Sequence, residues 1–330
     1  MYPSCSPRET ADADLKAIKI ADILTAAGAA GIAGNNLGHG TPLRAAGTWW
    51  AGSGFKLNIR SLESLALTLG FNSIPIPASS KTSNKNTVVR VNVESWQNNR
   101  MNLESLTLNP GASLEPYTPS KLAFQFIGDS LLAGQFLPKG VDQAWPFLVG
   151  EAFKAEHVVT AQPGAAFTDT GIVSYGNEHG VSFQFFRVDR GHGILLHDTT
   201  PWNFGRDKPA ATHIVIHIGA NDASQNVTDI QFVQVYTNFL ARLRSIYSQQ
   251  PIFVFTPYYL GQYRKIVDLR HAQGDKNIFL VNTTGWVTWD DVFSDNQHPN
   301  IPGHQHIADK FQAWLDNWGL KPEAHWATRA

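Results

Sequence analysis

Two short stretches of the chain place reactive side chains where buried strands are expected to end. FQFIGDSLLAG, residues 124–134, runs from apolar residues into Asp129 and Ser130, and IGAND, residues 218–222, closes another apolar run with Asn221. A serine hydroxyl attacks a carbonyl when an imidazole takes its proton, and an amide can stabilise the oxyanion that forms. The pattern therefore indicates acyl-transfer chemistry. A serine after a strand can equally be a helix N-cap, and an asparagine there can form an Asx turn.

Two further segments carry the remaining groups that such chemistry needs. AQPGAA, residues 161–166, follows a third apolar run with Gly164, and SDNQHPNIPGH, residues 294–304, contains Asp295 and His298 just before an expected helix. An imidazole that acts as a base needs a partner that fixes its tautomer and compensates its charge. The histidine and aspartate are therefore candidates for the base and its orienting group, although the aspartate could also only cap a loop.

The elements expected to position these residues are parallel strands that alternate with helices. The predicted strands are apolar throughout, which is typical of strands buried on both faces: LAFQFIG (122–128), HVVTA (157–161), HIVIHIG (213–219), IFVFT (252–256) and NIFLVN (277–282). Residues 229–250 instead have helical apolar spacing. This order predicts a three-layer α/β domain whose ligands bind at the carboxyl ends of the strands.

The part of the chain before residue 119 has a different composition. Short alternating runs separated by Gly, Pro, Ser and Asn clusters predict antiparallel strands of a small β-sandwich or jelly roll. Residues 109–120 contain three prolines and are expected to connect the two parts. We therefore expect an N-terminal extension, a jelly-roll domain and a catalytic domain, with the boundaries 1–39, 40–118 and 119–330.

In these motifs the sequence resembles the GDSL, or SGNH, hydrolase superfamily. GDSLLAG, the glycine of QPGAA, GAND and DNQH follow the order of its four blocks over about residues 120–318. The resemblance implies a flavodoxin-like sheet domain, a triad of Ser130, His298 and Asp295, and an oxyanion hole formed by the backbone N–H groups of Ser130 and Gly164 and the side chain of Asn221. Leu132 occupies the second glycine position of a Gly-x-Ser-x-Gly elbow, which disfavours the ordinary lipase-type fold.

The two-part organisation resembles carbohydrate esterase family 2, whose members deacetylate polysaccharides such as xylan. LRAAGTWWAGSGFKLNI, residues 43–59, looks like the first sandwich strands of that family, a looser match than the catalytic blocks. Some members lack the triad aspartate. Asp295 is present here, so a full triad is expected.

Three tryptophans in predicted loops are candidates for contact with a sugar: Trp202, Trp286 and Trp289. Their flat apolar faces suit sugar rings, but each could instead fill a hydrophobic core. The segment 174–211, rich in Gly, His and Phe, is expected to shape the mouth of the cleft and the acyl preference.

The expected function is a serine esterase that removes acetyl or another short acyl group from carbohydrate through an acyl-enzyme. One alternative is a lipase or lysophospholipase on the same scaffold. Another is a carbohydrate-binding protein with an inactive hydrolase domain. Acetate release from acetylated xylan would discriminate best between these functions.

Composition and charge exclude several other classes. Twenty-six basic and 27 acidic residues give a formal net charge of -1 without blocks of like charge, so neither nucleic acid nor an anionic membrane is an expected partner. No run is long enough for membrane insertion. The lone Cys5 cannot form an intrachain disulfide. We expect a monomer.

No cofactor or metal is expected. The segment HPNIPGHQH is compatible with a metal site of His298, His304 and His306. However, His304 and His306 are two positions apart on an expected helix, so their side chains should point to nearly opposite sides. Residues 16–34 loosely imitate a signal sequence, with Asp22 and glycines against it. A polysaccharide substrate favours secretion, and an intracellular esterase remains an alternative.

Overall fold

The structure, a computed structural model, describes most of the chain beyond residue 100 and shorter stretches before it. The described residues are 16–19, 46–48, 54–69, 72–77, 85–93, 101–169, 171, 173–187, 201–256, 260–295 and 297–328. Residues 188–200 of the segment expected to shape the cleft, most of the leader-like stretch 16–34 and parts of the run 43–59 lie outside them.

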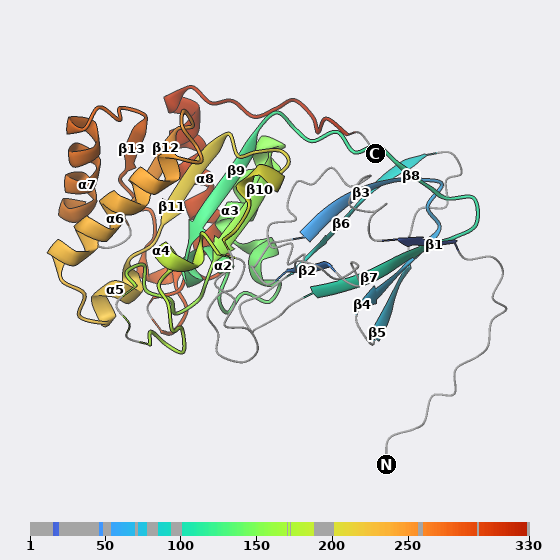
Figure 1. Ribbon diagram of the computed structural model, residues 1–330, viewed down its shortest axis with the longest axis horizontal. Coiled ribbons are helices and arrows are strands. Elements are labelled where there is room, and N and C mark those ends of the chain that lie inside the picture. The colour runs from blue at the N-terminus through green and yellow to red at the C-terminus, as the bar shows by residue number, and fades with distance from the viewer. Residues whose placement is uncertain are drawn as a thin grey trace, which may run out of the picture.

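A five-stranded parallel sheet forms the centre of the second part of the chain (Figure 1). In spatial order its strands are β10 (Glu156–Ala161), β9 (Ala123–Gly128), β11 (His213–His217), β12 (Ile252–Phe255) and β13 (Ile278–Val281). Strands β9, β11 and β12 are buried at every position, which explains their uninterrupted apolar sequences. All five predicted strands are therefore confirmed.

Helices cover both faces of this sheet, so the predicted three-layer α/β domain is confirmed (Figure 1). On one face α3 (Trp145–Phe153) and α8 (Ile301–Trp318) share a core with Phe126 and Phe253. On the other face α6 (Asp229–Arg244) and α7 (Leu260–Ala272) pack against the alternate side chains of β11 and β12. The remaining helical elements are short: α2 (Ser130–Ala133), η1 (Gly140–Gln143), α4 (Val181–Gln184), η2 (Phe204–Arg206), α5 (Ala220–Ser224) and η3 (Trp289–Asp291).

Helix α6 (Asp229–Arg244) begins where the sequence predicts but ends before residue 250, and α7 spans Leu260–Ala272. Thr228 and Gln231 form a capping box at the start of α6. At its end the Arg244 guanidinium donates to the carbonyl oxygens of Tyr247, at 2.9 Å, and Gln250. These bonds hold residues 245–250 in a turn that leads into β12, although the apolar spacing continues.

The carboxyl ends of β10, β9 and β11, three neighbouring strands, meet at one level. Gly128 of β9 is paired with Ala161 of β10 and with His217 of β11. A Cβ atom on Gly128 would lie 2.4 Å from the His217 carbonyl oxygen, so only glycine fits there. The loops that follow these three strands therefore begin at the same edge of the sheet.

The first part of the chain forms two antiparallel sheets that share one apolar core. The first has the order β1-β7-β4-β5 with β2 also paired to β7, and the second has the order β6-β3-β8. The strands are β1 (Lys16–Lys19), β2 (Ala46–Thr48), β3 (Gly54–Arg60), β4 (Ser64–Leu69), β5 (Asn72–Pro77), β6 (Asn86–Asn92), β7 (Met101–Leu108) and β8 (Ser113–Glu115). The jelly-roll assignment and the three segment boundaries stay predictions, and the expected N-terminal extension contributes β1.

The C-terminal segment runs back along the chain that enters β9 (Figure 1). The backbone N–H of Glu323 donates to the Phe153 carbonyl at 3.0 Å, and the Thr328 hydroxyl bonds both backbone groups of Thr118. Among the described residues, no helix is both long and apolar enough to span a bilayer.

Candidate active site

The Ser130 hydroxyl lies against the His298 imidazole at the carboxyl edge of the parallel sheet. Their Oγ and Nε2 atoms are 2.8 Å apart, although 168 positions separate them in the chain. Ser130 is the first residue of α2, directly after the Asp129 N-cap, whose carboxylate accepts from the Leu131 backbone N–H at 3.0 Å. The N-cap function that a serine here can have is therefore performed by its neighbour, which leaves the hydroxyl to His298.

The loop between η3 and α8 carries both His298 and Asp295. The Asp295 carboxylate bonds His298 Nδ1 with one oxygen, and its other oxygen accepts from the backbone N–H groups of Gln297 and His298, each at 3.1 Å. Since a carboxylate can only accept, Nδ1 carries the proton and Nε2 presents its lone pair to the serine. Partial burial acts to raise the pKa of Asp295, but these hydrogen bonds outweigh it and hold the pKa below its ordinary value.

Gly164, in the loop after β10, and Asn221, in α5 after β11, reach the same edge. Gly164 has a φ of +73°, and a Cβ atom there would lie 2.7 Å from the Tyr175 Cβ, so a side chain would be strained and crowded. The Asn221 side-chain nitrogen lies 3.0 Å from the Ala165 carbonyl oxygen and 3.5 Å from an Asp129 carboxylate oxygen. The structure thus brings together Ser130, Asp295, His298, Gly164 and Asn221.

Two buried carboxylates support this edge. Asp129 is fully buried, and burial raises its pKa to about 7; the Leu131 N–H opposes this rise and nearby Asp222 adds to it. Asp222 accepts from the backbone N–H groups of Phe167 and Thr168 at 2.6 and 2.9 Å, so it holds the loop that follows Gly164. Both aspartates therefore hold the backbone around the site in place by accepting hydrogen bonds from its N–H groups.

A pocket of about 720 Å³ lies between the carboxyl ends of β11–β13 and the loop before α8, and its lining includes Leu131, Gln297 and Pro299, the chain neighbours of Ser130 and His298. It is lined by Leu131, His217, Phe255, Thr256, Thr283, Thr284, Gly285, Trp286, Val287, Thr288, Trp289, Val292, Gln297, Pro299 and Ile307. Two of the three sequence-predicted tryptophans, Trp286 and Trp289, belong to it. Trp202 does not line it, because its indole N–H donates to the Asp207 carboxylate near the start of β11.

No sequence motif marks His217, Thr256 or Thr283 as residues of a pocket. Thr256 ends the expected strand 252–256 and Thr283 directly follows the expected strand 277–282, which is the only sequence signal that they carry. His217 ends β11 and is buried, and burial lowers its pKa to about 3, so its ring is neutral. A neutral imidazole and threonine hydroxyls can exchange hydrogen bonds with an uncharged polar ligand.

The other histidines of the last loop point in different directions. His304 is buried, and its Nδ1 accepts from the Trp145 backbone N–H at 3.1 Å, whereas the exposed His306 pairs with Asp291 at 2.8 Å. Among the residues that the structure describes, no three His, Cys, Asp or Glu side chains are grouped to hold a metal ion.

A parallel α/β sheet with a serine, a histidine and an aspartate in contact at its carboxyl edge has the architecture of a serine hydrolase. Residues 126–306, more than half of the chain, match the GDSL-like lipase/acylhydrolase family, and the chain belongs to that family. It is accordingly a carboxylic ester hydrolase of the SGNH type. No curated protein matches its sequence.

Solved structures of carbohydrate esterases share its fold. An acetyl xylan esterase from the rumen bacterium Butyrivibrio proteoclasticus has a TM-score of 0.64 and 13% identity over 93% of this chain and 99% of that chain. A family two carbohydrate esterase from Clostridium thermocellum, in complex with cellohexaose, has a TM-score of 0.60 and 17% identity over 83% and 95%. A salicylyl-acyltransferase from a tetracycline biosynthetic pathway has a TM-score of 0.52 and 14% identity over 82% and 81%.

Proposed function

We propose that this chain is a serine esterase that removes acetyl or other short acyl groups from carbohydrate, such as xylan, through an acyl-enzyme. The observation that carries the proposal is the unbroken contact from Asp295 through His298 to the Ser130 hydroxyl, 2.8 Å from Nε2. This contact supports Ser130 as nucleophile, His298 as general base and acid, and Asp295 as the group that orients it.

The reaction then proceeds in two steps. Ser130 Oγ attacks the ester carbonyl while its proton moves to His298 Nε2. The bond to the sugar oxygen breaks, and the imidazolium returns the proton to that oxygen. Water repeats the attack on the acyl-enzyme and releases the carboxylic acid. Asp295 stays ionised throughout, because its pKa is held low, and it stabilises the imidazolium.

Each step passes through an oxyanion that needs donors. Within the described parts of the chain, the backbone N–H groups of Ser130 and Gly164 donate to no hydrogen-bond acceptor. They supply two of these donors, and the side-chain amide of Asn221 supplies the third. The amide now bonds Asp129 at the long distance of 3.5 Å, and this bond yields to the stronger interaction with a negatively charged oxygen.

The pocket beside the serine supports a sugar as the leaving group. Its lining combines two indole rings with four threonine hydroxyls, a neutral histidine and Gln297. Aromatic faces suit the apolar faces of sugar rings, and the hydroxyls can bond those of the sugar. Trp289 is 79% exposed, as a platform for a polymeric substrate requires. The fold shared with carbohydrate esterases agrees with this assignment, and a polysaccharide substrate implies action outside the cell.

The decisive variants are Ser130→Ala and Asn221→Ala, assayed on p-nitrophenyl acetate. We expect Ser130→Ala to lower kcat by roughly 10⁴-fold or more, and Asn221→Ala to lower kcat by roughly 10²–10³-fold with little change in KM. Ser245→Ala serves as a control, because this exposed serine directly follows α6 on the way to the amino end of β12, away from the carboxyl edge of the sheet. Unchanged turnover in Ser130→Ala would exclude the mechanism.

Substrate class is tested by acetate release from acetylated xylan and by comparison of acetyl with decanoyl esters. We expect acetate release and a preference for the acetyl ester. A preference for decanoyl esters without release from xylan would instead favour the lipase alternative.

A further inference from the structure

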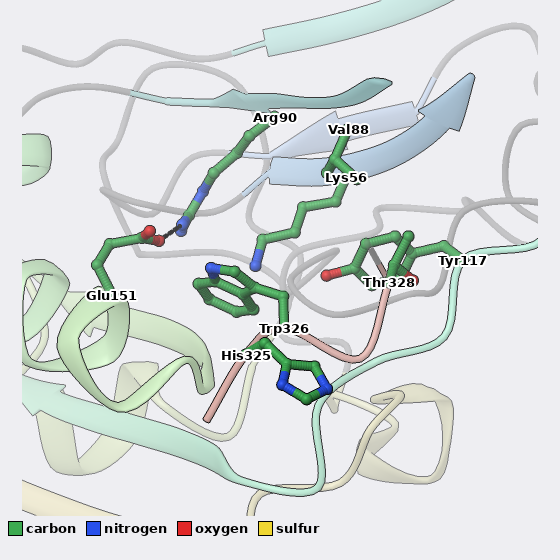
Figure 2. A pocket seen from close by; sticks show the side chains of 8 residues that line it. All are labelled: Lys56, Val88, Arg90, Tyr117, Glu151, His325, Trp326 and Thr328. Atoms are coloured by element: carbon green, nitrogen blue, oxygen red, sulfur yellow. Dashed lines mark hydrogen bonds and ion pairs between the residues drawn. The ribbon is translucent and has the colours of Figure 1, made fainter. Parts of the chain in front are cut away.

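The structure contains a second pocket, of about 480 Å³, which Figure 2 shows from close by. It is lined by Lys56, Val88, Arg90, Tyr117, Glu151, His325, Trp326 and Thr328, from β3, β6, the chain before β9, α3 and the C-terminal segment. Glu156, the ion-pair partner of Lys56, is the first residue of β10, whereas Ala161 ends this strand beside Gly128. Because a strand rises about 3.3 Å per residue, roughly 17 Å separate the two ends. This pocket is therefore distinct from the active site.

The Lys56 ammonium has donors left for a ligand. Lys56 is 6% exposed, and among the described residues its one hydrogen-bond acceptor is Glu156, at 2.8 Å. The Trp326 ring lies 3.9 Å from its Nζ, a cation–π contact that uses no second acceptor. An ammonium carries three N–H groups, so two remain at the wall of the pocket.

The Arg90–Glu151 pair adds an acceptor on the same wall. One Glu151 oxygen accepts from the Arg90 guanidinium at 2.8 Å, and the same guanidinium lies 2.9 Å from His157 and 4.2 Å from the Phe147 ring centre. The other Glu151 oxygen accepts no hydrogen bond from the described parts of the chain, and the Glu151 side chain is 41% exposed. Figure 2 shows the Trp326 indole beneath the Lys56 ammonium, with the Arg90–Glu151 pair to one side.

The charges of these groups decide which ligand fits. Lys56 and Arg90 are balanced by Glu156 and Glu151, so an anion would meet two carboxylates and a cation would meet an ammonium and a guanidinium. A neutral ligand with hydroxyl groups can both accept from the ammonium and donate to the free carboxylate oxygen. The partly exposed indole offers an apolar surface to the CH groups of a ring.

We propose that this pocket binds a sugar unit of an oligosaccharide and forms a second carbohydrate site, remote from the serine. Trp326 supplies the apolar contact, Lys56 a donor and Glu151 an acceptor. A pocket of this volume holds one or two sugar units. The Glu151 side chain is 41% exposed, so the carbohydrate chain can continue past it into solvent. The choice of probes below rests on the proposed carbohydrate function.

The test uses the full chain with Ser130→Ala and two unacetylated probes, xylohexaose and cellohexaose, in calorimetric titrations. We expect at least one hexaose to bind, and Trp326→Ala in the same background to weaken this site at least tenfold. Trp289→Ala is the matched control, because it removes an exposed indole from the pocket beside the serine. It should leave the second site intact. Circular dichroism checks that each variant is folded.

A second measurement needs no loss of a side chain at the site. In the ¹⁵N-labelled Ser130→Ala protein the indole N–H signal of Trp326, assigned with Trp326→Phe, should shift as a hexaose is added. If neither hexaose moves this signal at millimolar concentration, or if Trp326→Ala binds both as well as its parent, the proposal is wrong. Turnover of p-nitrophenyl acetate by the unmutated protein tests the proposed esterase function separately, whatever the hexaoses do.

Discussion

Asp129 lies between the last residue of β9 and Ser130, and its carboxyl group is sealed from solvent. Burial raises its pKa from 3.8 to about 7, so the folded protein binds this proton more tightly than the unfolded chain does. The stability gained from the proton is fully present below about pH 4. It is lost as the pH rises towards 7, by up to about 4 kcal/mol for a shift of this size.

Asp129→Asn should remove this pH dependence. The amide oxygen can still accept from the Leu131 N–H, but the side chain has no proton to release. We therefore expect the unfolding midpoint of the variant to rise relative to the unmutated protein between pH 5 and pH 8.5, whatever its offset at pH 5. Thermal melts across this range measure it. Two curves that stay parallel would show that Asp129 does not titrate there.

At the level of residues, the sequence predicts best those groups that belong to a short local pattern. Ser130 directly follows a glycine-terminated strand, and Asp295 and His298 lie three positions apart before a helix, so their local geometry follows from chain order. The pocket residues Thr256 and Thr283 do not form such a pattern. They come together only because β12 and β13 are neighbours and end at the same level.

At the level of elements, the buried parallel strands could be located from apolar runs because burial on both faces requires an apolar residue at nearly every position. The helix end at Arg244 could not, since long-range bonds stop α6 while its apolar spacing continues. Strand β1 was not separated from the leader-like stretch, because four residues carry too little periodicity.

One side chain joins the start of α8 to the loop that carries His298. The Asn300 oxygen caps α8 by accepting from the Gly303 N–H at 3.0 Å, and its nitrogen donates to the carbonyl oxygens of Asp290 and Val292, at 2.8 and 3.2 Å. The cap stabilises the helix, and the two donated bonds close the loop.

Asn300→Ala removes both functions and should lower the free energy of unfolding by about 1–3 kcal/mol. It should also lower kcat at least tenfold, because a misplaced imidazole loses its alignment with Ser130. Asn300→Asp is the matched variant, since it keeps the capping oxygen and loses the donors. We expect it to recover helix stability more than kcat. Equal recovery of both would contradict a separate function for the donated bonds.

At the level of the whole molecule, the Glu156 carboxylate connects the antiparallel strands to the parallel sheet. It is 2% exposed, and it accepts from Lys56 of β3, from the Tyr117 hydroxyl and from the Ser120 N–H, at 2.8, 2.7 and 3.1 Å. Burial lowers the pKa of Lys56 while Glu156 acts to raise it, so the two charges depend on each other. Neither motif nor periodicity predicts this pair, because its members lie 100 positions apart.

Removing one partner of a buried pair leaves the other charge uncompensated, whereas removing both leaves no buried charge. Lys56→Met should therefore lower the free energy of unfolding by about 3–5 kcal/mol. Lys56→Met with Glu156→Gln should recover most of this loss, because the glutamine oxygen can still accept from Tyr117 and methionine can pack against the Trp326 ring. Urea unfolding of the unmutated protein, the two single variants and the double variant gives the coupling energy.

Arg60→Met is the control on the same strand, since its pair with Glu115 is half-exposed and should contribute less than about 1 kcal/mol. Strictly additive effects of Lys56→Met and Glu156→Gln would show that the interaction between these two side chains does not stabilise the fold.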